Sequence, residues 1–501
     1  MADSIIVVGA GIGGIAVAAR LARAGYRVTV VEKTEHAGGR ASTIEEQGFF
    51  FDTGPSLFLM PPVFAETYRD LGERMEDHLE LMRIDPTYRV HFSDGSTLDL
   101  TSDLHALQRQ LDALEPGAFD ALLRFLRDGY RRYYLSLERF VGRNFTNLLQ
   151  FVNPANLPLL FDLKPLQSHY QDTAQHFKDR RLRAALSFQN MYLGLSPFDA
   201  PATYTLLQYT EMVEGVWYPR GGMYSIIASL TRIAERLGVE FRYNAPVERI
   251  EIAGGRATGV TLAGGERLAA DVVVANADLP YVYAALLPPE PYAERLAKLK
   301  YTSSTLMFYW GLRGERSQGL LHHNVFLSDH VYRESFAQIF REHTLPQEPS
   351  FYIHAPVRTV PGFAPTDGDA LMVLVPTGHI DDTRPQDWPA QLQRARRWVL
   401  ERLARIGLRD IEGRIVLERT LTPPDYQRIW NLAKGATFGL SHNFWQVGYL
   451  RPHNRHDRYG NLYFSGASTH PGTGLPIVLL SARLAAERIM NEQGLPTGKR
   501  G

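Results

Sequence analysis

"IIVVGAGIGGIAVAARLARAGYRVTVVEK", residues 5–33, is the stretch that decides the fold class of this chain. Its first four residues predict a buried parallel strand, because they are β-branched and do not alternate with polar residues. A glycine-rich turn then leads into an alanine-rich helix predicted over residues 12–24, and residues 26–31 predict a second strand. This order of strand, turn, helix and strand is typical of a Rossmann-like α/β fold.

The turn carries the spacing G-x-G-x-x-G at Gly9, Gly11 and Gly14, with Gly13 as a further small residue. The first glycine permits the tight turn, the second lets backbone approach a pyrophosphate, and the third lets the helix pack against the strand. The helix N-terminus supplies amides for an anion. Glu32 ends the second strand, where a carboxylate can accept both hydroxyls of an adenosine ribose. We therefore predict a dinucleotide site.

Two further glycine-rich segments favour FAD over a nicotinamide dinucleotide. "AGGRAST" (residues 37–43) places Gly39 and Arg40 soon after the ribose strand, where they supply phosphate-facing backbone and a bidentate cation. The alternative is a plain loop with a surface arginine. "NLYFSGASTHPGTGLPIVLLSARLAAERIM" (residues 461–490) predicts a second junction of strand, loop and helix, whose helix N-terminus can face a flavin. A cofactor contacted by both ends of the chain is long, which fits FAD.

Narrower motifs give the chain a resemblance to the bacterial-type phytoene desaturases, which are FAD-dependent carotenoid desaturases of the amine-oxidase and glutathione-reductase-like flavoprotein class. The motifs cover almost the whole chain: "GAGIGG", "GGRA", "FDTGPS", "GVWYPRGGMYSI", "FYIHAP", "RPHNR" and "NLYFSGASTHPGTGLP". The resemblance implies a Rossmann-like FAD-binding domain and an interleaved substrate domain of mixed sheet and helices, α/β locally and α+β overall. It extends the expected FAD contacts to Lys33, Val247, Gly466, Gly474 and Leu475.

The length of 501 residues also predicts two domains, because it exceeds one ordinary hydrophobic core. We expect the FAD-binding domain over residues 1–100, 226–290 and 425–495. The substrate-binding and membrane-associating domain is expected over residues 101–225 and 291–424.

Composition narrows the classes of partner. Lys+Arg and Asp+Glu balance at 54 each, so no nucleic-acid partner is predicted. The chain has no cysteine, which excludes disulfides and a cysteinyl-flavin bond and fits a cytoplasmic protein. No metal site is predicted, because the 16 histidines are scattered and the adjacent His322 and His323 lack a nearby carboxylate in the sequence. We also expect no signal peptide.

The segment "NFTNLLQFVNPANLPLLF" (residues 144–161) combines Leu and Phe with prolines and asparagines, which argues against a transmembrane helix. It suits a patch that rests on a bilayer, and the alternative is a buried loop. The resemblance favours peripheral association with the cell membrane, because a C40 hydrocarbon must be collected from lipid. Basic residues flank the segment at Arg131, Arg132, Arg139, Arg143 and Lys164.

Desaturation by such an enzyme removes a hydride, which a flavin can accept, and a proton from the neighbouring carbon. Asp179 and Arg183 are four residues apart on a predicted helix and fit the family pattern. They are candidates for handling the proton that leaves the substrate. His470, in the expected flavin loop, is a third candidate. Arg451 and His453, in "RPHN", could shape the flavin site or the tunnel mouth, and the alternative is a structural role. The structural alternatives are a surface ion pair for the first two and a histidine bonded to local backbone for the third. Oxygen or a membrane quinone is expected to reoxidise the flavin.

Two departures from the family pattern keep other functions open. Ser468 replaces a usual glycine, and bulky residues fill 477–480 where small ones are usual. The same family includes 3,4-desaturases of hydroxylated carotenoids and carotenoid terminal oxidases. A non-catalytic isoprenoid carrier and a water-soluble amine oxidase are more distant alternatives.

Overall fold

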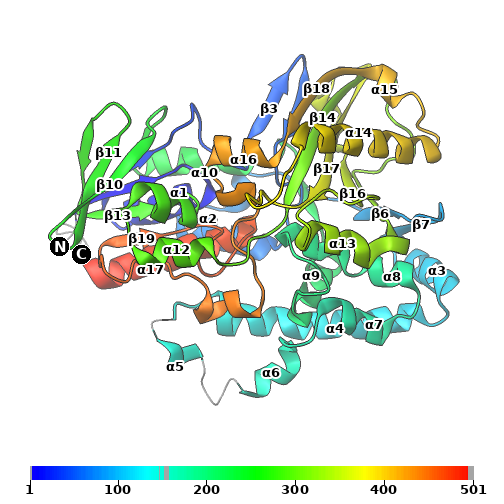
Figure 1. The fold of residues 1–501 in the computed structure, drawn as a ribbon, viewed down its shortest axis with the longest axis horizontal. Helices are drawn as coiled ribbons and strands as arrows, with labels where there is room; N and C mark the ends of the chain where they lie inside the picture. Colours follow the sequence, from blue (N-terminus) through cyan, green and yellow to red (C-terminus); the bar gives the residue numbers. More distant parts are fainter. Residues whose placement is uncertain (1–2, 146, 152–156, 495–501) are drawn as a thin grey trace.

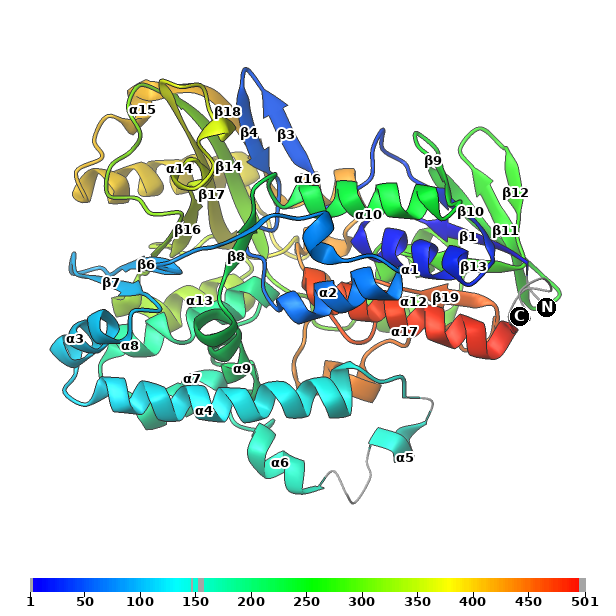
Figure 2. The same ribbon diagram turned by 180° about the vertical axis from the view of Figure 1, so that it is seen from behind.

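The computed structural model describes residues 3–145, 147–151 and 157–494 (Figure 1). Two parts, each built on its own sheet, lie side by side in Figures 1 and 2. A group of helices lies below them, mostly under the second sheet. The first and last described elements, β1 (Ser4–Val8) and α17 (Leu475–Gln493), both belong to the first part.

The first part contains a five-stranded parallel sheet in the order β19-β13-β1-β2-β9. Its strands are β1 (Ser4–Val8), β2 (Arg27–Val31), β9 (Glu240–Arg242), β13 (Val272–Ala275) and β19 (Leu462–Phe464). The Rossmann-like order is confirmed, with helix α1 spanning Ile12–Arg23 between the first two strands. Alternate residues of β1 face two different cores, because side chains alternate along a strand.

One core lies between the parallel sheet and helices, and the other lies between the parallel sheet and a small antiparallel sheet. Ile5 and Val7 pack in the core that contains α1, α10 (Tyr224–Arg236) and α17 (Leu475–Gln493). Ile6 and Val8 pack in the core that contains the three-stranded antiparallel sheet. That sheet is formed by β10 (Val247–Ala253), β11 (Arg256–Leu262) and β12 (Arg267–Ala269). The parallel sheet is thus buried on both faces, which explains its continuous apolar strands.

The second part is built on a seven-stranded sheet in the order β18-β14-β17-β16-β15-β6-β7. Its strands are β6 (Tyr88–His91), β7 (Thr97–Leu100), β14 (Ser304–Arg313), β15 (His323–Phe326), β16 (Phe351–His354), β17 (Gly368–Thr377) and β18 (Ile415–Leu421). Residues 88–100 therefore belong to this sheet, whereas the sequence analysis placed them in the FAD-binding domain. The pairing of β6 with β15 spans more than 230 residues, and no local pattern predicts it.

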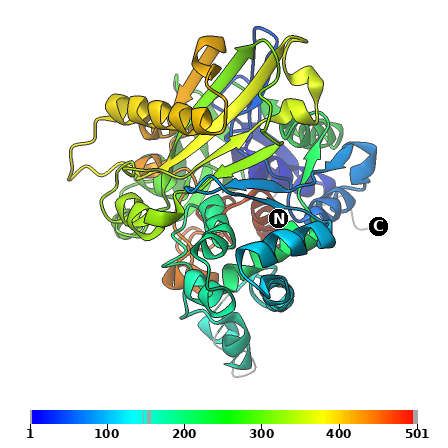
Figure 3. The same ribbon diagram turned by 90° about the vertical axis from the view of Figure 1, so that its right-hand side faces the viewer.

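Helix α14 (Trp388–Arg405) covers one face of the second sheet, outside its strands in Figure 3. On that face, Phe308 and Trp310 of β14 pack against α14. Met307 and Tyr309, on the opposite face, join the core of the first part. The two parts consequently share one hydrophobic core where they meet.

The remaining elements are short strands and helices. The short strands are β3 (Thr43–Glu46), β4 (Phe49–Asp52), β5 (Leu81–Arg83) and β8 (Trp217–Pro219). The other helices are α2 (Pro61–Asp70), α3 (Leu104–Leu114), α4 (Ala118–Ser136), α5 (Leu148–Phe151), α6 (Leu157–Leu163), α7 (His169–His176), α8 (Arg180–Ala185), α9 (Leu206–Tyr209), α11 (Leu279–Tyr281), α12 (Pro291–Ala297), α13 (Tyr332–Phe340), α15 (Ile411–Arg414) and α16 (Pro423–Trp430). None of the helices in the described ranges has both the length and the apolarity needed to cross a membrane.

Candidate flavin site

The glycine-rich turn between β1 and α1 requires its glycines for different reasons. Gly9 has a φ of +99°, a backbone conformation that favours glycine. A Cβ on Gly14 would lie 2.0 Å from the carbonyl oxygen of Gly9, so the helix can pack here only without a side chain. A Cβ on Gly11 would meet only Asn276 Oδ1, at 3.0 Å, and otherwise open space. Gly11 therefore borders a space that is open in front of the helix.

The N-terminus of α1 is available to an anion. Gly11 is its N-cap and offers no side-chain cap, and the first turn holds no acidic residue. The first intrahelical bond runs from Ile15 N to Gly11 O, so the preceding amides have no helical acceptor. This arrangement fits the phosphates of a dinucleotide.

Glu32 lies at the end of β2 beside this turn, as predicted, and its side chain is buried. Its Oε2 accepts a hydrogen bond from Ala10 N at 2.7 Å, and its Oε1 accepts one from Thr34 N at 3.0 Å. The carboxylate thus fixes the turn to the strand end. Oε1 also accepts from the Thr34 hydroxyl at 2.9 Å, so Oε2 is the oxygen that keeps acceptor capacity, and the ribose contact stays a prediction.

The second glycine-rich junction reaches the same edge of the sheet. Asn276, which follows β13, donates from Nδ2 to Ser465 O at 2.8 Å, directly after β19. A Cβ on Gly13 would lie 2.6 Å from Asn276 Nδ2 and 2.8 Å from Val478 Cγ1 of α17. Ser465 Oγ is buried and has no hydrogen-bond partner among the described residues. Both ends of the chain therefore meet at one site, and each contributes a helix N-terminus.

The other predicted cofactor residues line this edge. Lys33 Nζ donates to Asn431 Oδ1 at 3.0 Å, and Arg40 Nη1 donates to Thr437 O at 2.6 Å. Desolvation lowers the pKa of the Arg40 guanidinium, and the nearby Asp278 opposes that shift. Most of the residues predicted to contact the cofactor are half-buried: Gly9, Gly11, Lys33, Gly39, Arg40, Val247, Gly466, Gly474 and Leu475. Together these residues offer the uncapped amides of α1, the Arg40 guanidinium and the Glu32 carboxylate, a combination that fits an elongated dinucleotide. The individual contacts stay predictions.

Comparisons with known proteins identify the group that fits. The family described as flavin containing amine oxidoreductase matches residues 12–490. A zeta-carotene-forming phytoene desaturase of Myxococcus xanthus is 48% identical over 97% of this chain and 93% of its own length. An all-trans-zeta-carotene desaturase of the same organism is 36% identical over 98% and 94%. A variant of putrescine oxidase shares the fold, with 17% identity, a TM-score of 0.66 and coverage of 97% of this chain and 99% of that one.

The chain belongs to the bacterial-type phytoene desaturase family, within the flavin-containing amine oxidoreductases. The resemblance stated from the motifs is therefore confirmed, and the cofactor is a flavin.

Arg451 has the structural role that the sequence analysis weighed for it, because it organises the loop that precedes α17. Its side chain is 1% exposed, and burial lowers its pKa to about 10. All five N–H groups of the guanidinium donate to backbone carbonyls. The acceptors are the oxygens of Leu440, Ser441, Gln446, Ala467 and Thr469, at 2.5–3.2 Å. Arg451 therefore joins residues 440–446 to the loop that precedes α17.

The two departures from the family pattern have structural explanations. Ser468 donates from Oγ to Asp278 Oδ1 at 2.5 Å and accepts from Leu440 N at 3.2 Å, so its hydroxyl adds a link in the flavin loop. Val478, Leu479 and Leu480 are buried in the core that α17 shares with α1. Their bulk therefore fills that helix interface.

His470 makes the backbone contact that was weighed against a catalytic role. Its Nε2 donates to Arg143 O at 2.8 Å, and burial lowers its pKa to about 4. A neutral imidazole with this pKa is a weak proton acceptor at neutral pH. A catalytic role for His470 stays a prediction.

The predicted pairing of Asp179 with Arg183 is wrong. Asp179 is the N-cap of α8 and pairs with Arg181, at 2.7 Å, because its non-helical backbone turns the carboxylate toward the first turn. Arg183 Nε instead donates to Phe177 O at 2.7 Å. Helix α8 lies beside α3, at the opposite end of the molecule from α1 in Figure 1. A role of either side chain in proton removal stays a prediction.

A buried acid lies among the helices of the second part and was missed, since nothing near it in the sequence predicts its burial. Glu211 is 1% exposed. Its carboxylate accepts from the Tyr88 hydroxyl and from Gln189 Nε2, both at 3.1 Å. Burial raises its pKa to about 8 despite these hydrogen bonds. Glu211 is consequently protonated in the folded desaturase at neutral pH.

We expect Glu211→Gln to flatten the pH dependence of stability. A raised pKa means that folded protein holds a proton which unfolded protein has lost, so wild-type stability falls as pH rises from about 4.5 to about 8. The amide stays neutral and can keep both hydrogen bonds. Between about pH 5.5 and about pH 8.5, the free energy of unfolding should fall by about 1–3 kcal/mol more in wild type than in the variant. Urea unfolding at both pH values measures this, and equal slopes would contradict it.

Proposed function

We propose that this protein is an FAD-dependent carotenoid desaturase of carotenoid biosynthesis, which introduces double bonds into an acyclic C40 carotenoid such as phytoene. The observation that carries the proposal is the full-length relationship to a zeta-carotene-forming phytoene desaturase, at 48% identity. The chain also keeps each glycine of the β1–α1 turn and the uncapped N-terminus of α1, which support FAD as the flavin.

When bound, the flavin supplies a hydride acceptor for a C–H bond beside the conjugated polyene. The residues of the chain bind and orient. The amides of α1 and Arg40 would hold the pyrophosphate, and Glu32 the ribose. The loop fixed by Arg451 would set the position of the α17 N-terminus against the flavin. Apolar side chains shared by the two parts would keep water from the reacting carbons.

The runner-up functions keep the family and change the substrate. They are 3,4-desaturation of hydroxylated carotenoids and oxidation of a terminal methyl group. The substitutions at residues 477–480 kept these functions open, but three of the four side chains pack in the α1–α17 core. An isoprenoid carrier without flavin chemistry is disfavoured, because a carrier has no need of two glycine-rich junctions at one sheet edge.

Expression in cells that accumulate phytoene tests the proposed function. We expect coloured carotenoids with longer conjugation, such as neurosporene or lycopene, on chromatography of the extracted pigments. A Gly14→Val variant serves as the inactive control, because its side chain would overlap Gly9 O. Unchanged phytoene beside soluble, flavin-loaded wild type would contradict phytoene as substrate, and lycopene and its hydroxylated derivatives would be supplied next.

We further propose that the protein is cytoplasmic and rests peripherally on the cell membrane. Part of the predicted segment, residues 146 and 152–156, lies outside the described residues. Within the described part, α5 packs against residues 448–450, since the Phe151 ring lies 2.3 Å from where a Cβ of Gly448 would be. Large apolar side chains are exposed on α5 and α6 and in segments 164–166 and 445–450: Leu148, Leu149, Phe161, Leu166, Trp445 and Leu450. These exposed side chains, which form the proposed apolar patch, suit insertion among lipid headgroups.

One predicted basic flank does not face the lipid. Arg132 is 2% exposed, and its Nη1 pairs with Asp172 Oδ2 at 2.5 Å inside the helical layer. Arg131 pairs with Asp162 and Lys164 with Asp172. Of the five predicted basic flanks, Arg139 and Arg143 are the ones for which the described residues provide no ion pair.

The apolar patch predicts how liposome binding responds to charge. Leu149, 79% exposed, and Trp445, 74% exposed, should lose binding when both become Asp, because carboxylates resist entry into the interface. Each large side chain that enters lipid is worth about 1.5 kcal/mol or more, so we expect at least a tenfold weaker partition. The matched control changes Leu104 and Val416, exposed elsewhere, to Asp. Equal co-sedimentation of both double variants with liposomes would contradict the patch.

Either oxygen or a membrane quinone is proposed as the electron acceptor. A quinone fits the membrane-resting patch, since it would reach the flavin from the same lipid as the substrate. Flavin reoxidation by a soluble quinone analogue, compared with oxygen, distinguishes the two.

A further inference from the structure

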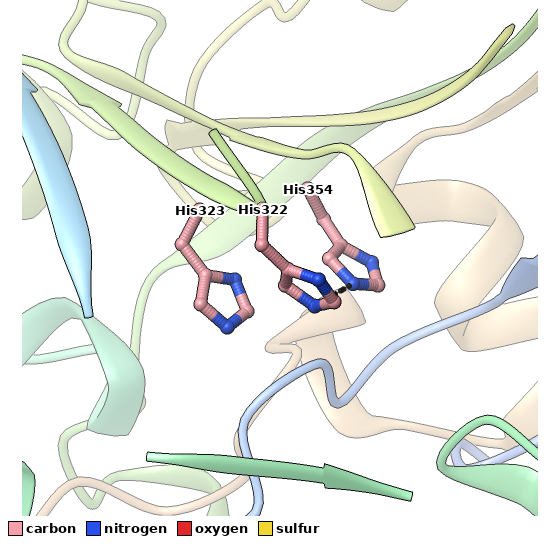
Figure 4. Close-up of side chains that lie close together, drawn as sticks. All are labelled: His322, His323 and His354. Carbon is pink, nitrogen blue, oxygen red and sulfur yellow. Dashed lines mark hydrogen bonds between the residues drawn. The ribbon is translucent and has the colours of Figure 1, made fainter. Parts of the chain in front are cut away.

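Three buried histidines meet on two neighbouring strands of the seven-stranded sheet (Figure 4). His323 begins β15, His322 directly precedes that strand, and His354 ends β16. The antiparallel register places His323 opposite His354. The three side chains are between 0% and 4% exposed, and one ring nitrogen of each lies within 4.8 Å of the others.

The hydrogen bonds of this cluster resemble those of a metal site without its ion. His322 Nε2 and His354 Nε2 lie 3.0 Å apart, which is close to the separation of about 3.3 Å between two nitrogens on a tetrahedral zinc. His322 Nδ1 bonds Thr359 Oγ1 and His323 Nδ1 bonds the Tyr352 hydroxyl, each at 2.6 Å. Such contacts to the outer nitrogen orient metal-binding imidazoles.

His323 Nε2 adds an independent sign of a missing ligand. It is buried and has no hydrogen-bond partner among the described residues. An orphaned nitrogen in a fully buried side chain costs free energy, which coordination would recover. The sequence analysis predicted no metal site because His322 and His323 lack a carboxylate partner, but it did not foresee that β16 brings a third histidine to them.

The surroundings can tolerate a divalent cation. The Tyr218 ring centroid lies 4.7 Å from that of His322, and the Tyr218 hydroxyl donates to Asp52 Oδ2 at 2.6 Å. The Asp52 carboxylate is therefore separated from the histidines by the Tyr218 side chain. Arg358, the nearest cation, is neutralised by Asp369. An oxygen atom of water or hydroxide would be the fourth ligand, and hydroxide would offset part of the charge of the ion.

We propose that His322, His323 and His354 bind one Zn²⁺ through neutral imidazoles, with water or hydroxide as the fourth ligand. Three nitrogens favour zinc over magnesium or calcium, which prefer oxygen ligands. The ion would fasten β15 to β16 in the sheet of the second part. None of the three histidines is a predicted flavin contact, and the existence of the site does not depend on the proposed desaturase activity.

Equilibrium dialysis of the full, tag-free chain against Zn²⁺ tests the proposal, after chelator treatment and with bound zinc measured by mass spectrometry. We expect one Zn²⁺ per chain that survives gel filtration. His323→Gln and His354→Gln should each lower the zinc affinity at least tenfold. The matched control is His379→Gln, which alters a buried histidine whose ring centroid lies 4.1 Å from that of the half-buried His343, and it should keep the zinc.

X-ray absorption at the zinc edge of the wild-type protein keeps the test decisive if a variant fails to fold. We expect three imidazole nitrogens and one oxygen at about 2.0–2.1 Å. The proposal is overturned if wild type retains no zinc, if the triad variants bind zinc like wild type, or if the ion has fewer than three imidazole ligands.

Discussion

A Gly11→Val variant should fold but lose its flavin. The residue has φ −69° and ψ 170°, an extended conformation that valine adopts without strain. Its Cβ would meet only Asn276 Oδ1, which lies at the end of a side chain, so the sheet and α1 need not move. The isopropyl group would nevertheless occupy the space in front of the α1 amides, where the pyrophosphate is proposed to bind. We expect flavin affinity to fall at least a hundredfold, an effect of about 3 kcal/mol.

Flavin absorbance per chain after gel filtration, together with circular dichroism, measures both halves of that expectation. Gly362→Val is the matched control, because a Cβ there has no atom within 4 Å and the position lies outside the groove. Stoichiometric flavin in the Gly11 variant would refute the assignment of the turn to the cofactor. An unfolded variant would refute the open space that the structure assigns to this position.

Arg451→Met should cause a large loss of stability together with loss of flavin. The substitution keeps an unbranched side-chain stem but removes five donors and leaves five carbonyls of two loops without them. Each buried acceptor left unpaired costs about 1–3 kcal/mol, and partial hydration reduces the sum, so we expect a loss on the order of 3–5 kcal/mol. Urea unfolding followed by tryptophan fluorescence measures the loss.

Two further variants separate the hydrogen bonds from the charge. Arg451→Lys restores the charge but has three donors, so it should recover only part of the stability. Arg455, four residues after Arg451, forms a surface ion pair with Glu492. Arg455→Met removes that pair and should cost less than about 1 kcal/mol. Full stability in Arg451→Lys would show that charge, and not the five-fold hydrogen bonding, is what the loop needs.

The first site elements were predictable because their determinants are local. The β1–α1–β2 unit follows from β-branched strands, glycine spacing and an alanine-rich helix within residues 5–33, and α1 ends one residue before the predicted end. The position of Glu32 follows from the same unit. The meeting of the second junction with the first was expected from its own pattern of strand, glycine-rich loop and helix, and Asn276 makes the contact in the structure.

The remaining features depend on contacts that no sequence window contains. Strand β6 pairs with β15 and β7 pairs with β6, so residues 88–100 join the second sheet, although the sequence analysis placed them in the FAD-binding domain. His354 reaches His322 through strand register, and Arg451 reaches its carbonyls through a folded loop. The Asp179–Arg183 spacing predicted a helical pair, but an N-cap precedes the helix and its carboxylate turns to the backbone instead. Spacing identifies neighbours on a regular helix and fails at its ends.

The proposed desaturase function is tested most directly by mixing FAD-loaded protein with phytoene in liposomes, without oxygen. The account predicts that the absorbance of oxidised flavin bleaches, with one flavin reduced for each double bond formed, and that a more conjugated carotenoid is extracted. Flavin that stays oxidised with phytoene, zeta-carotene and hydroxylated carotenoids alike would contradict the account.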